Sequence, residues 1–215
     1  MKIFLDSTNI EEIREINKLG IIDGITTNPS LIAKSGKGFN QILKSICKEV
    51  KGPISAEVTA ENFENMLSEA KILSKISKNI VIKLPLTFNG LKACKHLTKK
   101  NYKTNVTLCF TVPQAILAAK AGATYISPFI GRLDDIGQNG VNLIRDIKKV
   151  FSNYTNFKTK ILAASVRSIE HVTEVAKAGA DISTIPPKIF HQLYKHELTD
   201  KGLKIFLEDL SLIHI

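Results

Sequence analysis

The sequence predicts an α/β protein, a single-domain (β/α)8 barrel with an extra helix at its C-terminal end. Short apolar, β-branched runs alternate eight times with longer amphipathic segments along the 215 residues. Runs such as Ile80-Val81-Ile82 are apolar on both faces, which is typical of a parallel sheet buried on both sides. An open Rossmann-like or flavodoxin-like sheet is the alternative, but neither Gly-x-Gly-x-x-Gly nor a phosphate-loop Gly-Lys-Ser/Thr motif occurs.

The elements can be placed from their periodicity. The expected strands are 2–6, 21–26, 53–58, 79–84, 103–109, 123–128, 159–165 and 181–186. The expected helices are 9–19, 60–77, 87–99, 112–121, 140–151, 168–178 and 199–210. The first helix has isoleucines three residues apart and follows an N-capping cluster that ends at Asn9. Gly122 and Gly179, each within Lys-Ala-Gly-Ala, are expected to end helices.

Length and composition limit the classes of protein to consider. A chain of 215 residues suits one domain spanning 1–215, with 44% hydrophobic and 23% charged residues. We expect no membrane span and no signal peptide, and therefore a cytoplasmic protein. The three cysteines are widely spaced, which favours buried thiols in a reducing compartment, and the five histidines suggest no metal site.

The formal net charge of +10 suits anionic partners, either nucleic acid or phosphorylated metabolites. The lysines are scattered, however, aromatic residues make up only 7% of the chain, and no RNA-recognition or helix-turn-helix signature is present. The composition therefore disfavours nucleic acid as a partner.

Polar residues interrupt the apolar strands mostly at their C-terminal ends. These residues are Asp6, Thr26, Asn28, Glu57, Lys83, Asn105, Thr107, Ser127, Ser165, Arg167 and Thr184. In a (β/α)8 barrel the C-terminal ends of the strands form the active-site face. Gathering so many polar groups around one opening is costly for folding unless they serve each other. The pattern therefore predicts a functional site there.

Lys83 follows the apolar run at 80–82, so burial should disfavour its charged form and lower its pKa. A deprotonated lysine attacks carbonyls and forms Schiff bases. Asp6 and Glu57 would supply the separate proton-transfer groups that a lyase-type reaction needs. The alternative is structural: Lys83 pairs with one of these carboxylates or extends its amine to solvent.

Arg132 and Arg167, with the hydroxyl of Ser165, follow the sixth and seventh strands. Barrels often bind phosphate near strands seven and eight, and the arginine fork suits phosphate oxygens. These residues are therefore candidates for a phosphate site. The alternative is a pair of surface salt bridges to Asp134 and Asp135.

Several segments resemble the small transaldolases of the transaldolase/fructose-6-phosphate aldolase family. They are 4–7, 24–32, 82–85, 104–108, 127–135, 163–167 and 198–203. The most specific are Thr-Thr-Asn-Pro-Ser at 26–30 and Gly-Arg-Leu-Asp-Asp at 131–135. The resemblance covers nearly the whole chain up to Asp209.

The resemblance implies a transaldolase of the non-oxidative pentose phosphate pathway. Such an enzyme moves a dihydroxyacetone unit from sedoheptulose 7-phosphate or fructose 6-phosphate to glyceraldehyde 3-phosphate or erythrose 4-phosphate. It needs no metal and no organic cofactor. Its substrates are sugar phosphates, and neither nucleic acid nor membrane is expected as a partner.

The resemblance also implies roles for individual residues. Lys83 would form the Schiff base, Asp6 would take the proton of the C4 hydroxyl, and Glu57 with Thr107 would hold a proton-shuttling water. Thr26, Asn28, Asn105, Ser127 and Phe129 would contact the dihydroxyacetone part, and Arg132, Ser165 and Arg167 would bind the phosphate.

Two alternatives remain open. A fructose-6-phosphate aldolase releases free dihydroxyacetone, but those aldolases carry glutamine at the position of Glu57 and tyrosine at that of Phe129. A non-catalytic barrel that binds sugar phosphates or nucleic acid would need no reactive amine.

Assembly is the last expectation. Small members of the family form homo-oligomers, pentamers or decamers, in which the C-terminal helix reaches a neighbouring subunit. Residues 199–215 would pack in this way, although a helix folded back on its own barrel fits the same residues.

Overall fold

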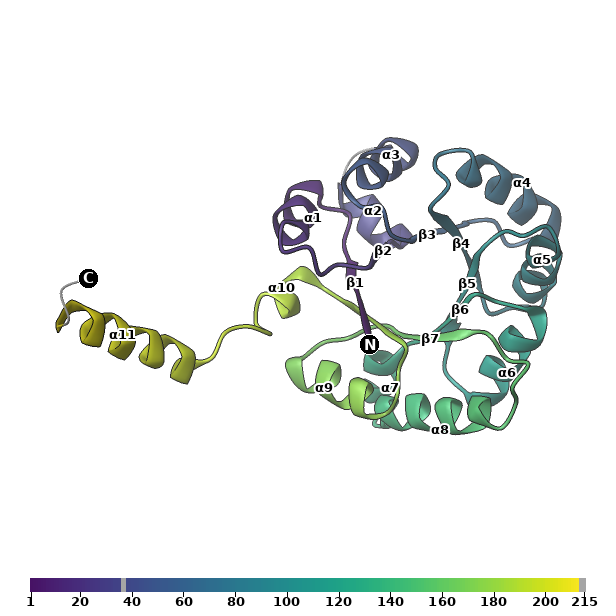
Figure 1. Cartoon of the computed structure of the whole chain (residues 1–215). Helices are drawn as coiled ribbons and strands as arrows, with labels where there is room; N and C mark the ends of the chain where they lie inside the picture. The colour runs from purple at the N-terminus through teal and green to yellow at the C-terminus, as the bar shows by residue number, and fades with distance from the viewer. Residues whose placement is uncertain (36–37, 213–215) are drawn as a thin grey trace.

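The computed structural model describes residues 1–35 and 38–212, in which eight parallel strands form a closed barrel. Each strand pairs with the next, and β8 pairs with β1. Figure 1 shows the arrangement of the barrel. The strands are β1 (Lys2–Asp6), β2 (Gly24–Thr26), β3 (Ile54–Glu57), β4 (Ile80–Pro85), β5 (Thr104–Cys109), β6 (Tyr125–Pro128), β7 (Lys160–Ala163) and β8 (Ile182–Ile185). The predicted (β/α)8 barrel is confirmed.

The helices surround the barrel, with the exception of the last one, which projects away from it (Figure 1). They are α1 (Ile10–Asn17), α2 (Pro29–Ser35), α3 (Phe39–Glu49), α4 (Phe63–Ser74), α5 (Phe88–Lys99), α6 (Val112–Ala121), α7 (Ile130–Asp134), α8 (Gly140–Ser152), α9 (Ile169–Lys177), α10 (Pro187–Phe190) and α11 (Glu197–Leu212). Helices α2, α3, α7 and α10 are additions to the sequence-based prediction. Asn9 accepts two backbone N–H groups at the start of α1, and Gly122 and Gly179 are left-handed after their helices, as expected.

Six of the eight strands are shorter than predicted, and β2 and β7 differ most, by three residues each. Strand β2 begins at Gly24, and just before it the Asp23 N–H donates to the carbonyl oxygen of Ile3 while the Asp23 carboxylate accepts the N–H of Ile3. Strand β7 ends at Ala163, two residues before Ser165, whose left-handed backbone with φ 62° lies outside the β region.

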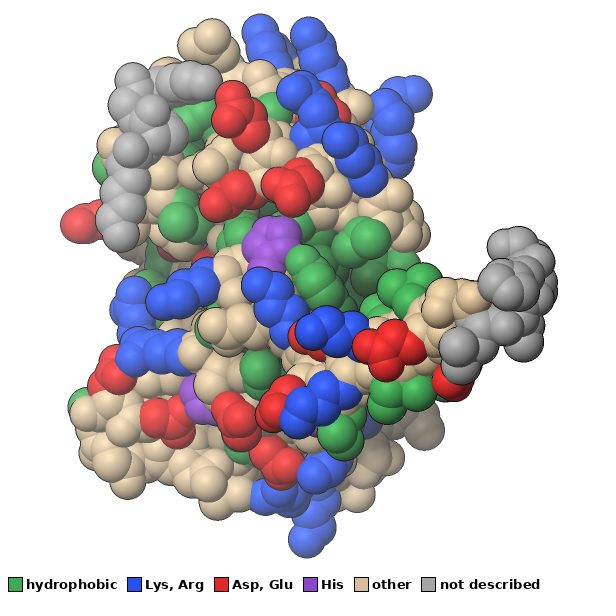
Figure 2. Space-filling view, turned by 90° about the vertical axis from the view of Figure 1, so that its left-hand side faces the viewer, with side chains coloured by type: hydrophobic (Ala, Val, Ile, Leu, Met, Phe, Trp, Pro, Cys, Tyr) green, Lys and Arg blue, Asp and Glu red, His purple; other side chains and the backbone are tan. Residues whose placement is uncertain are grey.

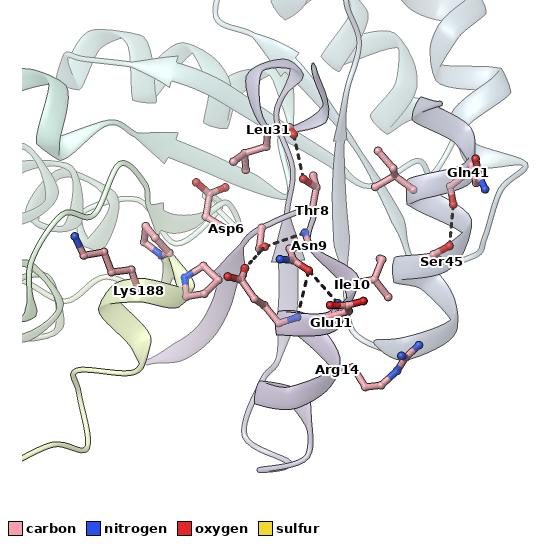
Figure 3. A pocket seen from close by; sticks show the side chains of 15 residues that line it. Asp6, Thr8, Asn9, Ile10, Glu11, Arg14, Leu31, Gln41, Ser45 and Lys188 are labelled. Atoms are coloured by element: carbon pink, nitrogen blue, oxygen red, sulfur yellow. Dashed lines mark hydrogen bonds between the residues drawn. The ribbon is translucent and has the colours of Figure 1, made fainter. Parts of the chain in front are cut away.

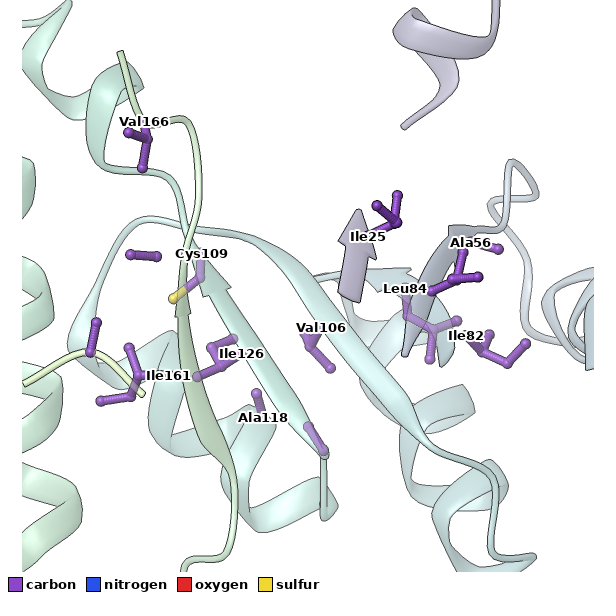
Figure 4. Packing of buried hydrophobic residues seen from close by; sticks show 14 of the residues in the cluster. Ile25, Ala56, Ile82, Leu84, Val106, Cys109, Ala118, Ile126, Ile161 and Val166 are labelled. Carbon is purple, nitrogen blue, oxygen red and sulfur yellow. The ribbon is translucent and has the colours of Figure 1, made fainter. Parts of the chain in front are cut away.

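Two apolar clusters lie on opposite sides of the sheet. The larger one fills the space between strands and helices, and Figure 4 shows part of it, with Ile25, Val106 and Ile126 of the strands and Ala118 of α6. The smaller cluster comprises Phe4, Leu162, Ala164 and Ile182, with Tyr125 and Phe129 packed against it. Phe4 lies two residues before Asp6 on the same face of β1. The smaller cluster therefore forms an apolar floor inside the barrel, beneath the polar strand ends.

Helix α11 stands away from the barrel, and Figures 1 and 2 both show it as a projecting arm. Its apolar side chains are exposed; Phe206 and Leu207 keep 66% and 67% of their surface in contact with solvent. Residues 213–215 of the predicted tail lie outside the described residues. No helix in the described ranges is long and apolar enough to cross a membrane.

Candidate active site

A cavity of about 240 Å³ opens at the C-terminal ends of the strands. It is lined by Asp6, Thr26, Asn28, Lys83, Ser127, Phe129, Arg132, Leu162, Ala164, Ser165, Arg167 and Thr184. Most of the predicted site residues therefore share one cavity. Asn105 and Thr107 are fully buried in the adjoining barrel wall, while Glu57 contacts Lys83 and lines a separate hollow near α4 and α5.

Lys83 lies near the C-terminal end of β4 and is buried, with only 4% of its surface exposed. Strand register aligns Glu57 with Lys83 and Lys83 with Asn105, so the three residues form one row across β3, β4 and β5. The Lys83 Nζ lies 2.9 Å from Glu57 Oε2 and donates to the carbonyl oxygen of Thr27 at 3.1 Å. The ion pair that the structural alternative predicted is thus present, and it also places a proton acceptor beside the amine.

Asp6 lies across the cavity on β1. Thr26 Oγ1 donates to Asp6 Oδ1 at 2.7 Å and lies 2.6 Å from Thr184 Oγ1. Burial raises the pKa of Asp6, against the lowering effects of the Thr26 hydrogen bond and the Lys83 charge. A carboxyl group with a raised pKa is suited to proton transfer near neutral pH. Thr184 was recognised only as a polar strand end, and its contact with Thr26 now makes it part of the site.

Asn105 is held in one orientation by two hydroxyl groups. Its Nδ2 donates to Ser55 Oγ at 3.1 Å, and its Oδ1 accepts from Ser127 Oγ at 2.7 Å. Because the Ser127 proton is used in that bond, its free lone pairs are left to accept a hydrogen bond within the cavity. Sequence reasoning missed Ser55. It gave no signal because it lies two residues before Glu57 on β3 and not at the charged end of the strand.

Thr107 carries a buried hydroxyl without a hydrogen-bond partner among the described residues. The next residue, Leu108, has a left-handed backbone with φ 60°, and the pairing of β5 with β6 shifts register between Val106 and Cys109. Backbone strain of this kind persists only where the surroundings impose it and is common at functional sites. Nothing in the amino-acid pattern signals this bulge, since leucine is not a left-handed residue by preference.

The other end of the cavity is positively charged. The Arg132 guanidinium lies over the Phe129 ring at 5.1 Å from its centroid, and Arg167 forms a two-point ion pair with Asp135. Of the two salt bridges that the alternative proposed, this one is present, whereas Asp134 pairs with His171. Both guanidinium groups nevertheless line the cavity.

A larger hollow of about 780 Å³ lies on the other side of Asp6, between α1, α3 and the start of α10 (Figure 3). Its lining includes Asn9, Gln41 and Lys188, but Lys83 is absent from it. Asp6 is the residue shared by the two spaces. The smaller cavity is therefore the candidate active site, because it combines the amine, a carboxylate and the two guanidinium groups.

The fold and this cavity define a class of protein: a (β/α)8-barrel enzyme with a buried lysine at the C-terminal ends of its strands. The family model described as Transaldolase/Fructose-6-phosphate aldolase matches residues 3–213. The chain belongs to this family, and it is an enzyme of the transaldolase type, as the sequence predicted.

Individual proteins agree with that assignment. A probable transaldolase of Bartonella tribocorum is 59% identical over 97% of this chain and 96% of its own length. Probable transaldolases of Rhizobium meliloti and Brucella ovis are 58% and 57% identical over the same shares. A solved thiamine phosphate pyrophosphorylase from Pyrococcus furiosus superposes with a TM-score of 0.60 at 15% identity, over 89% of this chain and 93% of its own. That last likeness concerns the fold alone.

Proposed function

We propose that this enzyme transfers a dihydroxyacetone unit between sugar phosphates through a Schiff base on Lys83. The donors would be fructose 6-phosphate or sedoheptulose 7-phosphate, and the acceptors erythrose 4-phosphate or glyceraldehyde 3-phosphate. The observation that carries the proposal is the buried Lys83 amine at the cavity, 2.9 Å from the Glu57 carboxylate. No metal or organic cofactor is required.

In the first stage the Lys83 nitrogen attacks C2 of the ketose, and the carbonyl oxygen becomes a hydroxyl. Loss of water then gives an imine. Glu57 accepts a proton from the amine and, with the unpartnered Thr107 hydroxyl, holds the water that carries protons to and from the leaving oxygen. A carboxylate can perform this exchange because it ionises, whereas an amide cannot.

In the second stage Asp6 takes the proton from the C4 hydroxyl. The C3–C4 bond breaks, its electron pair enters the protonated imine to form an enamine, and an aldose phosphate leaves. The acceptor aldehyde then forms a new bond to C3, Asp6 returns the proton, and hydrolysis frees the product from Lys83. The raised pKa of Asp6 supports this exchange of a single proton in both directions.

Polar side chains on the remaining strands would hold the substrate. Asn28, Asn105 and Ser127 would bind the hydroxyl groups of the dihydroxyacetone part, together with Thr26 and Phe129, which line the same cavity. Arg132, Ser165 and Arg167 would bind the phosphate at the positive end of the cavity.

The second candidate within the family is an aldolase that releases dihydroxyacetone. Glu57 and Phe129 occupy the positions at which those aldolases carry glutamine and tyrosine. Phe129 has no hydroxyl to position a second water for release, and its ring lies under Arg132. Both residues support transfer over release.

Borohydride added with fructose 6-phosphate should reduce the imine and increase the mass of the protein permanently at Lys83. Lys83→Met should remove this trapping, whereas Lys188→Met, which changes an exposed lysine of α10, should retain it. Absence of trapping in the unaltered protein would contradict the Schiff base and favour a non-catalytic sugar-phosphate-binding barrel. In a separate turnover assay without borohydride, release of glyceraldehyde 3-phosphate beyond one equivalent per subunit should require erythrose 4-phosphate. Equally fast continued release without it would identify an aldolase.

The remaining expectations concern the setting of the enzyme. We infer a cytoplasmic homo-oligomer, a pentamer or decamer, that works on sugar phosphates and not on nucleic acid. The exposed apolar side chains of α11 support assembly. On the face shown in Figure 2, Lys and Arg side chains gather in separate groups with Asp and Glu between them, which gives a phosphate backbone no continuous basic track.

A further inference from the structure

We propose that Asp135 is a positioning residue for the phosphate site, because it fixes the orientation of the Arg167 guanidinium. This inference rests on the proposed function, in which Arg167 binds the substrate phosphate. It concerns the segment at 131–135, whose two aspartates are given no role by the proposed chemistry. Three independent contacts join this segment to the residues around Arg167.

The first contact is the ion pair itself. Asp135 accepts from both terminal nitrogens of Arg167, and the Nη2–Oδ2 distance is 2.7 Å. A guanidinium group has five N–H donors, so this pairing leaves the Nε–H and one hydrogen on each terminal nitrogen for a phosphate. The carboxylate therefore holds the fork without using all of its donors.

The second contact fixes the backbone of Arg167. Its N–H donates to His171 Nδ1 at 3.2 Å, and His171 Nε2 lies 2.9 Å from Asp134 Oδ2. Since Nδ1 accepts, Nε2 is the nitrogen that carries the proton toward Asp134. Asp134 thus holds the backbone of Arg167 in place through His171, while Asp135 holds the Arg167 side chain.

The third contact is a close approach at Gly131. Its N–H donates to the carbonyl oxygen of Ser165 at 3.1 Å. A Cβ at this position would lie 2.3 Å from that oxygen and 2.7 Å from Arg167 Nε. Only glycine allows the segment to pack so tightly against the arginine, so the Arg167 side chain is confined from this side as well.

Stability alone does not account for the ion pair. Both side chains are about half exposed, and ion pairs in contact with solvent contribute little to folding. The hydrogen bonds from Arg167 lower the pKa of Asp135, so it stays ionised. What the pair does supply is orientation of a long, flexible cation that would otherwise lose rotamer freedom when the phosphate binds.

The test is the variant Asp135→Asn, which keeps the size of the side chain and loses its charge. We expect KM for fructose 6-phosphate to rise about three- to tenfold, from the cost of ordering one long side chain, with kcat unchanged. Borohydride trapping by dihydroxyacetone, which has no phosphate, should need the same concentration as before. Glu174→Gln, which removes an exposed ion pair with Lys177 on α9, is the matched control and should change neither value.

A double-mutant cycle separates positioning from a general structural effect. In an Arg167→Ala background, Asp135→Asn should produce no further rise in KM. An unchanged or lower KM in the single variant, or a further rise in the double variant, would overturn the inference. Those results would leave the proposed function intact, because trapping of dihydroxyacetone tests Lys83 independently; failure of trapping in the unaltered protein would remove the proposed function instead.

Discussion

Burial of Asp6 affects stability and the proposed chemistry in opposite directions. Because the pKa of Asp6 is raised in the folded state, the folded protein binds this proton more tightly than the unfolded chain does. Its contribution to stability is therefore complete below the ordinary aspartate pKa of about 3.9 and is lost as the pH rises through the raised value. Above that raised value the ionised carboxylate destabilises the fold while serving as the proposed base.

Asp6→Asn should therefore be more stable than the unaltered protein at pH 7, and this advantage should shrink as the pH falls toward about 4. The amide oxygen can still accept from Thr26. Transfer activity should fall by about 10² to 10⁴, the usual contribution of a general acid–base group. Thermal unfolding at several pH values measures the first effect, and Asp200→Asn on the exposed α11 is the control. A stability difference that does not vary with pH would contradict the argument.

Single residues also show what the sequence could reveal. Lys83 and Asp6 were found because parallel strands bring their C-terminal ends together, and their positions on the strands are enough to place them. The choice of partner was not predictable, since Lys83 had two carboxylates available and Arg167 two aspartates. The left-handed backbone of Leu108 is imposed by the sheet around it and leaves no mark on residue type.

At the scale of elements, close packing of α5 against β4 depends on Gly90. A Cβ on Gly90 would lie 1.9 Å from the carbonyl oxygen of Pro85, whereas one on Gly202 of α11 would meet nothing within 4 Å. Gly90→Ala should lower the free energy of unfolding by about 1–3 kcal/mol, as overpacking usually does.

Gly202→Ala is the matched control, because alanine is the better helix former and the site is open. It should leave the free energy of unfolding unchanged or slightly higher. Urea denaturation of the two variants measures the difference. Equal losses would show that the contact with Pro85 is not what makes Gly90 necessary.

Helix starts explain which helices the sequence revealed. The six predicted helices that follow strands each begin after a side chain that accepts a backbone N–H, and these caps are Asn9, Asn62, Thr87, Thr111, Asn139 and Ser168. Helices α3, α7 and α10 instead follow Gly38, Phe129 and Pro186, with no side-chain cap bond. The capping signal was missing at these three helices. Helix α2 was missed as well, although Asn28 Oδ1 accepts the N–H of Leu31 at its start.

At the scale of the whole molecule, the apolar side chains of α11 are left exposed in a single subunit. Phe206→Glu should shift the protein toward a monomer, because burying a phenylalanine contributes about 1.5–3 kcal/mol and each 1.4 kcal/mol is a tenfold change in affinity. Lys204→Glu, exposed on the same helix, is the control for added charge. Sedimentation velocity distinguishes the states. An unaltered protein that sediments as a single subunit of 23.8 kDa would contradict the proposed assembly.

The apolar floor built by Phe4, Leu162 and Ile182 has a consequence for the order of events. Because this floor closes the barrel beneath the reacting groups, substrates enter and leave on the side of the C-terminal strand ends, where the cavity measures only about 240 Å³. Two sugar phosphates cannot pass each other there. The aldehyde product must leave by the route along which the acceptor arrives. The protein therefore has to retain its covalently held fragment in the cavity after the product has left and before the acceptor has bound.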